Sequence, residues 1–298
     1  MNKRARHLAT LSPFMLECTQ SKNRPRRITC TEPRREPSHV PITNDLRAML
    51  VLPTYNEREN LPALIAAIQA LPSPIRVIVV DDHSPDGTGA LADELAARAQ
   101  TNGGAPDRAV EVIHRAGKLG LGTAYAAGFQ RALVQGADLI LTMDADFSHH
   151  PKYLPAMLQA SHQHDLVIGS RYVPGGGVRD WGPQRKLLSW GANAIAHLVL
   201  GLHARDCTAG FRCYRRKVLE TVDPASIRAN GYSYLIEMLY RCERHGFQVG
   251  EVPIIFADRQ LGRSKISQSE IVKAGVTVLR LAIQRLTGAS PRIRALHR

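Results

Sequence analysis

The chain has 298 residues, of which 44% are hydrophobic and 22% are charged, a composition that excludes a wholly disordered protein and fits one large domain or two ordinary ones. Its five cysteines form no CxxC pair and no cysteine–histidine cluster, so neither a disulfide scaffold nor a zinc module is expected. The net charge of +13 lies at the ends: residues 1–47 carry ten Lys or Arg against four Asp or Glu, and residues 259–298 carry nine against one. Nucleic-acid-binding domains usually build a basic face into the fold, so no nucleic-acid partner is expected.

Residues 1–46 are rich in Arg, Pro and Thr and are predicted to form a basic, disordered extension. From Met49 onward, apolar runs alternate with amphipathic stretches, a pattern typical of strands interleaved with helices. Strands are expected at residues 49–52, 76–81, 110–114, 139–144 and 166–169, and helices at residues 59–70, 88–99, 123–134 and 152–163. The sequence therefore predicts an α/β fold with a mostly parallel sheet flanked by helices.

The last third of the chain contains helical patterns near residues 186–201 and 233–245 and an amphipathic stretch over residues 270–286. One face of that stretch carries Ile271, Gly275, Val278 or Leu279, Ala282 and Leu286. Such a face fits either a helix packed on the core or a helix on a membrane surface. A membrane span needs about 20 mostly apolar residues. The longest uncharged stretch, residues 187–202, is shorter, so no transmembrane helix is expected.

A pair of carboxylates follows the apolar run LILTM, in the segment Asp144-Ala145-Asp146. An isolated DxD motif is often only a solvated turn. Here, however, two carboxylates two residues apart at a buried strand end can reach one hard cation, such as Mg²⁺ or Mn²⁺. Because such an ion typically takes its other ligands from water and phosphate oxygens, the segment predicts a diphosphate partner.

A second pair of acids, Asp81 and Asp82, ends another expected strand. The residues that follow fit a turn and a helix capped by Asp86 or Thr88. The turn does not explain the two acids themselves, which could instead accept hydrogen bonds from ribose hydroxyls or base N–H groups. Both interpretations stay open at this point.

Eight segments occur along the chain in the order in which a known family has them: PTYNERENLP (53–62), DDHSPDGT (81–88), KLGLGTAY (118–125), MDADFSHHP (143–151), GSRY (169–172), DCTAGFRCY (206–214), GEVPIIF (250–256) and DRQLGRSK (258–265). Together they resemble the dolichol-phosphate (polyprenol-phosphate) mannosyltransferases, which are family-2 inverting glycosyltransferases of the GT-A type. The resemblance runs from about Met49 to Leu286. It implies a GT-A catalytic domain at residues 47–265, followed by an amphipathic helix and basic tail at residues 266–298.

The resemblance implies transfer of mannose from GDP-mannose to the phosphate of a membrane polyprenol or dolichol. Residues expected to hold the nucleotide are Pro53, Tyr55, Glu57 and Asp82, with Asp81 beside them. Residues expected at the diphosphate and at Mg²⁺ or Mn²⁺ are Asp144, Ala145 and Asp146, the two acids being the metal ligands. Residues expected to contact donor or acceptor phosphates are Arg171, Arg259 and Lys265, with Arg185 and Ser264 at the acceptor phosphate. Of these, Asp144, Asp146, Arg171 and Arg259 form the expected catalytic set.

A phosphate acceptor is already anionic, so no general base is expected; alignment of the reactants and neutralisation of the departing diphosphate are needed instead. Two positions depart from the family pattern. Ser148 stands where some members carry Gln, and Arg263 adds a positive charge to the DRQLGRSK loop. The neighbouring pair His149-His150 is interpreted as the start of a helix before Pro151 rather than as a metal site.

Two other functions fit the same residues: a polyprenyl-phosphate glucosyltransferase that uses UDP-glucose, and a catalytically silent nucleotide-sugar-binding subunit. The protein is expected to act as a peripheral protein on the cytoplasmic face of a membrane. The helices near residues 187–202 and 270–286 would form the apolar surface that receives the lipid, and a small membrane partner subunit is a further option.

Overall fold

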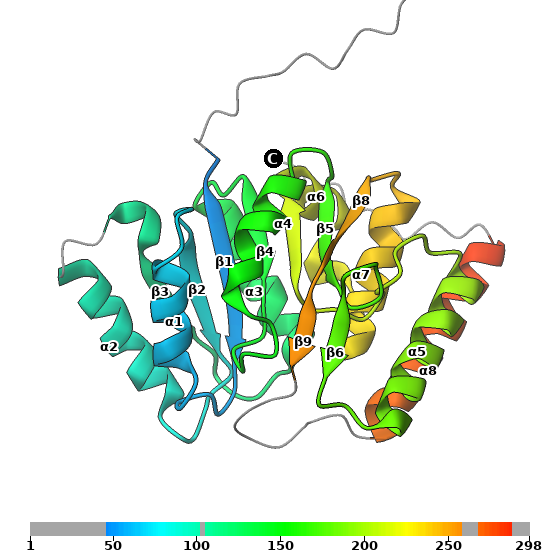
Figure 1. Cartoon of the computed structure of the whole chain (residues 1–298), viewed down its shortest axis with the longest axis horizontal. Helices are drawn as coiled ribbons and strands as arrows, with labels where there is room; N and C mark the ends of the chain where they lie inside the picture. Colours follow the sequence, from blue (N-terminus) through cyan, green and yellow to red (C-terminus); the bar gives the residue numbers. More distant parts are fainter. Residues whose placement is uncertain (1–45, 102–104, 258–267, 288–298) are drawn as a thin grey trace, which may run out of the picture. The chain divides into compact units, whose positions relative to one another are not determined.

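A seven-stranded sheet forms the centre of this computed structural model, which describes residues 46–101, 105–257 and 268–287 (Figure 1). The strands lie in the order β3-β2-β1-β4-β7-β5-β8, and every neighbouring pair is parallel except the two that involve β7. Their bounds are β1 (Ala48–Thr54), β2 (Arg76–Asp81), β3 (Val110–His114), β4 (Leu139–Thr142), β5 (Leu166–Ser170), β7 (Arg212–Arg215) and β8 (Val249–Pro253). The predicted α/β fold with a mostly parallel sheet is confirmed.

Helices cover both faces of this sheet because its central strands are apolar on both sides. In β1, Met49 and Val51 face a core built with α3, α6 and α7, while Leu50 and Leu52 face a core built with α1, α2 and α4. The helices are α1 (Leu61–Gln69), α2 (Thr88–Thr101), α3 (Leu121–Val134), α4 (Leu154–Ala160), α5 (Pro183–Leu200), α6 (Arg216–Val222), α7 (Tyr232–Arg244) and α8 (Gln268–Thr287). Burial on both faces is the usual property of parallel sheets.

The structure differs from the expected elements mainly around short segments. The strand expected at residues 139–144 ends at Thr142, and the helix expected at 152–163 is a 3₁₀ turn (Pro151–Tyr153) followed by α4. Among the described strands and α-helices, five were not predicted: β6 (Gly177–Arg179), β7, β8, β9 (Ile255–Ala257) and α6. Strand β7 reads RCYR, so it carries no apolar run, and its burial comes from its neighbours β4 and β5.

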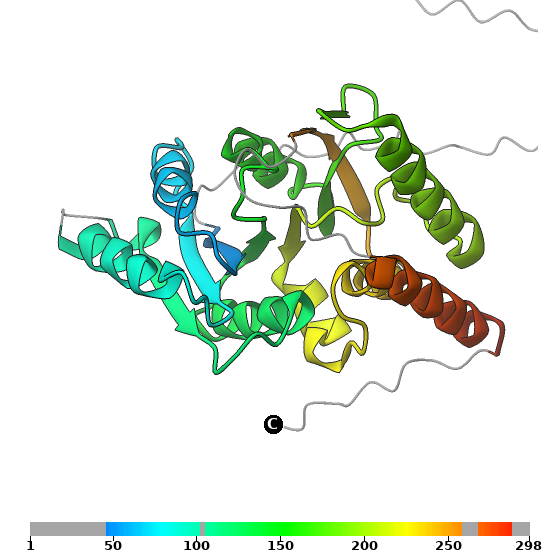
Figure 2. The same ribbon diagram turned by 90° about the horizontal axis from the view of Figure 1, so that it is seen from below.

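Helices α5 and α8 lie side by side at one end of the sheet (Figures 1 and 2). Helix α8 is fastened to α7 by charge, because the buried Glu237 carboxylate accepts hydrogen bonds from both Arg241 and Arg280. Arg285 of α8 donates to the carbonyl of Val199 at the end of α5, at 3.2 Å. Among the helices of the described residues, none is long and apolar enough to cross a membrane. The predicted domain boundaries at residues 46 and 265 stay predictions.

The expected apolar face of α8 is wrong in part. Val278 and Leu281 are buried against the core, whereas Leu279 and Leu286 are exposed. The helix therefore has two apolar stripes, one packed on the protein and one facing outward. The interpretation as a helix packed on the core is thus confirmed for one stripe, and the interpretation as a membrane-surface helix stays a prediction.

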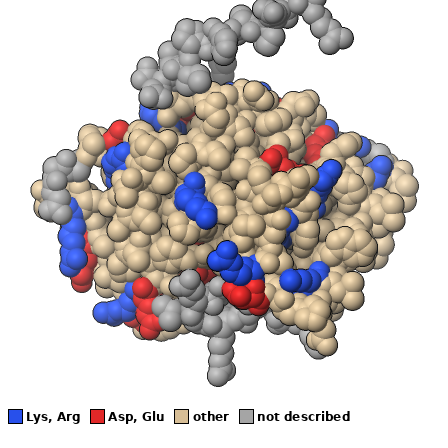
Figure 3. Space-filling view, in the orientation of Figure 1, with Lys and Arg blue, Asp and Glu red and all other residues tan. Residues whose placement is uncertain are grey.

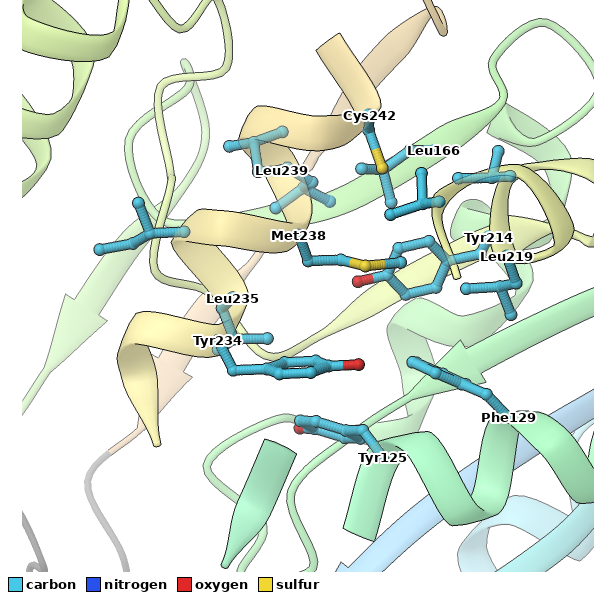
Figure 4. Close-up of a cluster of buried hydrophobic side chains, with 14 of the residues drawn as sticks. Tyr125, Phe129, Leu166, Tyr214, Leu219, Tyr234, Leu235, Met238, Leu239 and Cys242 are labelled. Atoms are coloured by element: carbon cyan, nitrogen blue, oxygen red, sulfur yellow. The ribbon is translucent and has the colours of Figure 1, made fainter. Parts of the chain in front are cut away.

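An aromatic cluster joins α3, β7 and α7 on one face of the sheet (Figure 4). The rings of Tyr125 and Phe129 stack at 5.9 Å between centroids, Tyr125 stacks on Tyr234 at 6.0 Å, and Phe129 meets Tyr214 edge-on at 5.4 Å. Offset and edge-on pairs of this kind add to the stabilisation that burial provides. The cluster thus fixes the antiparallel strand β7 against two helices.

Arg212 of β7 is a fully buried cation bound mainly by backbone carbonyls. Its guanidinium donates to the carbonyls of Ala209 at 2.8 Å, Leu235 at 2.9 Å and Cys207 at 3.0 Å. Three carbonyl partners satisfy a charge that would otherwise be costly to bury. The side chain therefore holds the loop before β7 in a single position.

Replacing Arg212 with Met is expected to destabilise the protein, because the three buried carbonyls lose their donor. The free energy of unfolding should fall by about 3 kcal/mol or more, as measured by urea denaturation. The control is Arg98→Met, which removes an exposed pair with Glu94 and should change stability by less than about 1 kcal/mol. Equal stability of the two variants would contradict this account of Arg212.

Candidate active site

Three strands of the sheet end in sharp turns at the same edge. Asn56 after β1, His83 after β2 and Phe147 after β4 have φ of 58°, 61° and 59°. These are left-handed backbone conformations that residues other than glycine rarely adopt. Such strained residues cluster at binding and catalytic sites, and here they lie in the PTYNE, DDHS and DADF segments.

Asp81 is buried at this edge of the sheet and makes hydrogen bonds within the protein. Its carboxylate accepts hydrogen bonds from Thr54 Oγ1 at 3.0 Å, from Ser84 N at 3.0 Å and from Ser84 Oγ at 2.5 Å. Because Thr54 lies opposite Asp81 in the pairing of β1 with β2, the acid joins two strand ends and the turn after them. The predicted helix cap is confirmed beside it, since Thr88 N donates to Asp86 Oδ1 at 2.9 Å.

Asp82 organises the loop that leads into α3. Its carboxylate pairs with Arg115 Nη1 at 2.6 Å and accepts from the amides of Leu119 at 3.1 Å and Gly120 at 2.9 Å. Arg115 was not predicted as a site residue, because it lies 33 residues away in the sequence and outside the recognised motifs. The structure therefore gives both acids structural partners, which the sequence did not reveal.

The residues predicted around the nucleotide lie at this same edge. Tyr55 packs beneath Lys118, whose Nζ is 3.9 Å from the ring centroid. Glu57 is buried, its amide donates to Thr88 Oγ1 at 3.0 Å, and its Oε2 accepts from Asn60 Nδ2 at 3.0 Å. Pro53 is half-buried in β1. Lys118 was not predicted as a site residue, although it is the first residue of the KLGLGTAY segment.

Two carboxylates follow β4, as the sequence predicts, with the buried Ala145 between them. Asp146 is buried, and its Oδ1 accepts from Ser148 N at 3.0 Å and Ser148 Oγ at 2.5 Å. Within the described ranges, no group of three or more His, Cys, Asp or Glu side chains is arranged to hold a metal ion. Two hard carboxylates still suit Mg²⁺ or Mn²⁺, which accept the rest of their ligands from water and phosphate.

The interpretation of the His149-His150 pair as a helix start is confirmed, because a 3₁₀ turn begins at Pro151 with His150 as its cap. His149, one residue earlier, is buried beside the two carboxylates. Its Nδ1 accepts from the Asp144 amide at 3.3 Å, and its ring packs against Phe211 and Phe256 at 5.2 Å each. Burial lowers the pKa of His149, although Asp144 and Asp146 act to raise it, so burial favours the neutral ring. His150 does begin the 3₁₀ turn, since its side chain accepts from Lys152 N at 3.1 Å.

A cavity of about 510 Å³ opens beside Asp144 and extends between α5 and α8. One end is polar and is lined by Asp144, His149, Arg171, Trp181, Arg185, Ser189 and Thr208. The other end is apolar and includes Leu188, Ile195, Val199, Ile236, Val278 and Leu279. Of the predicted site residues, Asp144, Arg171 and Arg185 thus meet in one cavity. Arg259, Ser264 and Lys265 lie outside the described residues.

Arg171 is held in place by the fully buried Asp206. Its Nε and Nη2 each donate to the carboxylate at 2.7 Å, its backbone amide donates at 3.0 Å, and Nη2 also reaches Thr208 Oγ1 at 2.7 Å. Burial alone would raise the pKa of Asp206, but the charge and hydrogen bonds of Arg171 hold it below its ordinary value of 3.8. Asp206 was not predicted, because its partner is 35 residues away.

Comparison with known proteins identifies the family. Residues 49–223 match the family described as Glycosyl transferase family 2. The chain belongs to glycosyl transferase family 2. It is 48% identical over 229 residues, 76% of this chain and 84% of the relative, to the polyprenol monophosphomannose synthase of Mycolicibacterium smegmatis. It is 43% identical over 235 residues, 79% of this chain and 93% of the relative, to the undecaprenyl-phosphate mannosyltransferase of Micrococcus luteus. The resemblance to polyprenol-phosphate mannosyltransferases is confirmed, and the protein is a transferase.

Solved structures agree on the fold. A mannosyltransferase from Pyrobaculum calidifontis, in complex with GDP-Man and Mn²⁺, superposes with a TM-score of 0.51 at 15% identity, covering 82% of this chain and 65% of that one. A structure described as a mycobacterial protein gives a TM-score of 0.52 at 19% identity, covering 82% of this chain and 76% of that one. At these identities the likeness shows the GT-A fold alone.

Replacing Asp206 with Asn is expected to destabilise this transferase, because Arg171 loses its buried counter-charge. The free energy of unfolding should fall by about 3 kcal/mol at pH 7. Because the pKa of Asp206 is lowered in the folded state, the pair stabilises the protein above the ordinary carboxyl pKa and loses this contribution as the pH falls. Urea denaturation at several pH values should therefore show wild type and variant converging in acid. The control is Glu220→Gln, which removes an exposed pair with Arg216 and should have little effect.

Proposed function

We propose that this protein transfers mannose from GDP-mannose to the phosphate of a membrane polyprenyl or dolichyl phosphate, with inversion at the sugar carbon and with Mg²⁺ or Mn²⁺. The named relatives support the sugar and the class of acceptor. The observation that carries the proposal is the change of character along one cavity, from a carboxylate and two guanidiniums to an apolar channel between two helices. A lipid phosphate complements both ends, because its anionic head fits the guanidiniums and its apolar chain fits the channel.

The donor nucleotide would bind along the edge formed by the ends of β1 and β2. Tyr55 and Glu57, with Pro53 before them, border this edge, and Lys118 covers the tyrosine ring. Asp82 would contribute while it orders the loop before α3, and Asp81 would shape the pocket through its bonds to the turn. The sugar diphosphate would then extend toward the Asp144-Ala145-Asp146 segment.

Asp144 and Asp146 are the residues that would hold the divalent ion, with Ser148 fixing the orientation of the Asp146 carboxylate. The ion supplies charge neutralisation for the departing diphosphate. The neutral His149 keeps the Asp144 backbone in place through its Nδ1. These residues orient the donor and need no change in protonation.

The chemistry needs no general base, because the attacking oxygen of the acceptor phosphate is already anionic. A bond forms between that oxygen and the anomeric carbon while the bond from this carbon to the diphosphate breaks, so no proton has to move. Arg171 and Arg185 line the cavity where the acceptor phosphate would lie and would align it for attack on the opposite face of the sugar. Arg259, Lys265 and Ser264 are proposed to complete the phosphate contacts.

The protein would meet its acceptor at a membrane surface, which we place on the cytoplasmic side. Large apolar side chains on α5 and α8 point outward beside the cavity: Leu187, Leu198, Val272, Val276, Ile283 and Leu286. On the face drawn in Figure 3, the basic and acidic residues shown in colour are interspersed and make no continuous basic field of the kind that nucleic acid would require. A small membrane partner subunit is a further partner that this apolar surface would accept.

Transfer of labelled sugar to a short polyprenyl phosphate in detergent tests the proposed reaction. Product is expected from GDP-mannose with Mg²⁺ or Mn²⁺, and little with EDTA. Asp146→Asn should remain folded, since the amide oxygen can still accept from Ser148. Its rate of transfer should fall by about a hundredfold or more, because a ligand of the metal ion is lost. The control, Asp93→Asn, changes an exposed acid on α2. Product from UDP-glucose would change the donor, and GDP-mannose binding without transfer would indicate a silent subunit.

Charged residues on the outward stripe test the membrane proposal. Leu198 and Leu286 are 83% and 86% exposed, so Leu198→Asp with Leu286→Asp should not affect folding. The double variant should be recovered much less in pellets of liposomes that contain anionic lipid. Its new carboxylates are costly to insert among lipid tails, and the negative surface of the liposome repels them. A matched variant, Val134→Asp, changes an exposed apolar residue at the end of α3. Equal sedimentation of all three proteins would contradict a membrane surface at α5 and α8.

A further inference from the structure

Trp181 lies between the two arginines of the cavity. It follows β6, directly after Asp180, whose φ of 62° turns the chain toward α5. The guanidinium carbon of Arg185 is 4.2 Å from the centroid of the indole, and that of Arg171 is 5.6 Å away. A cation over an aromatic face is attracted by the ring, so one side chain helps to position both cations.

The indole also packs against an aromatic ring. Phe256 of β9 meets it edge-on at 5.4 Å between centroids, and Trp181 is only 7% exposed. Arg171 is in turn fixed by Asp206. Three other parts of the chain, the end of β5, the helix α5 and the strand β9, thus converge on this ring.

The indole nitrogen of Trp181 is a buried donor that has no acceptor among the described residues. Buried polar groups nearly always have a hydrogen-bond partner, and leaving one unpaired costs free energy. An indole N–H can only donate, so its missing partner is an acceptor and not a cation or a metal. Two guanidiniums beside it make an anionic oxygen the favoured acceptor.

We propose that Trp181 binds the phosphoryl group of the lipid acceptor, donating its N–H to a phosphoryl oxygen while its ring positions Arg185 and Arg171. Trp181 lines the cavity, so its ring borders the space that the phosphoryl group would occupy. The identification of the ligand rests on the proposed function, and the donor diphosphate carries the same chemistry. The lipid phosphate is favoured because the apolar end of the cavity, with Leu188 and Leu279, adjoins these residues.

Fluorescence of Trp181 tests this proposal without relying on turnover. The chain has two tryptophans, so Trp190→Phe leaves Trp181 as the single reporter. Geranyl phosphate in detergent is expected to shift its emission saturably, while geraniol and GDP-mannose without lipid are not. An equal shift with geraniol, or a shift with GDP-mannose alone, would overturn the assignment to the acceptor phosphate. So would the absence of a shift when calorimetry detects binding of geranyl phosphate.

Kinetics of Trp181→Phe separate a binding role from a structural one. The variant keeps an aromatic face but loses the N–H, and Trp190→Phe is the comparator that loses the other tryptophan. The KM for geranyl phosphate should rise about tenfold, the factor expected for one hydrogen bond to a charged group, while the KM for GDP-mannose stays the same. A fall in kcat or in thermal stability with both KM values unchanged would overturn the proposal. If no sugar donor is used at all, the proposed function fails and the fluorescence titration still decides the role of Trp181.

Discussion

The ion pair between Arg171 and the fully buried Asp206 is the interaction on which the polar end of the cavity is built. Arg171 follows β5, and Asp206 leads into β7, the antiparallel neighbour of β5. Glu251 of β8 fixes the same turn by accepting from the amide of Asp206 at 3.1 Å. Arg212 donates to the carbonyls of Ala209 and Cys207, which follow Asp206 in the same loop. The cavity wall is therefore held at both ends. Such a preorganised wall can align a phosphate without rearranging.

The acidic residues of the site stabilise the local structure in addition to their proposed chemical roles. Asp81 joins two strand ends to a turn, Asp82 orders the loop before α3, and Asp146 receives two bonds from Ser148. Each therefore enters the site already oriented. These hydrogen bonds explain why carboxylates follow strands of Val and Ile. A turn exposed to solvent would not need carboxylates at these positions.

The sheet could be predicted from the sequence because its parallel strands are apolar runs bounded by turns, as in β1 and β2. Strand β7 could not, because it contains two arginines and is buried only through its neighbours. The same division holds for the site. Arg171 and Asp144 belong to recognisable motifs, and so does Asp206. The roles of Asp206, Arg115 and Trp181, however, depend on partners that come near only after folding. No local pattern reports such a partner.

The cavity opens between α5 and α8, and the outward stripes of both helices flank it. An acceptor that enters sideways from a lipid layer never has to leave that layer. For such an enzyme the effective substrate concentration is a surface density, so inert lipid added at constant total acceptor dilutes the substrate and slows the reaction. Saturation curves are then meaningful only as mole fractions, and encounter becomes a two-dimensional search.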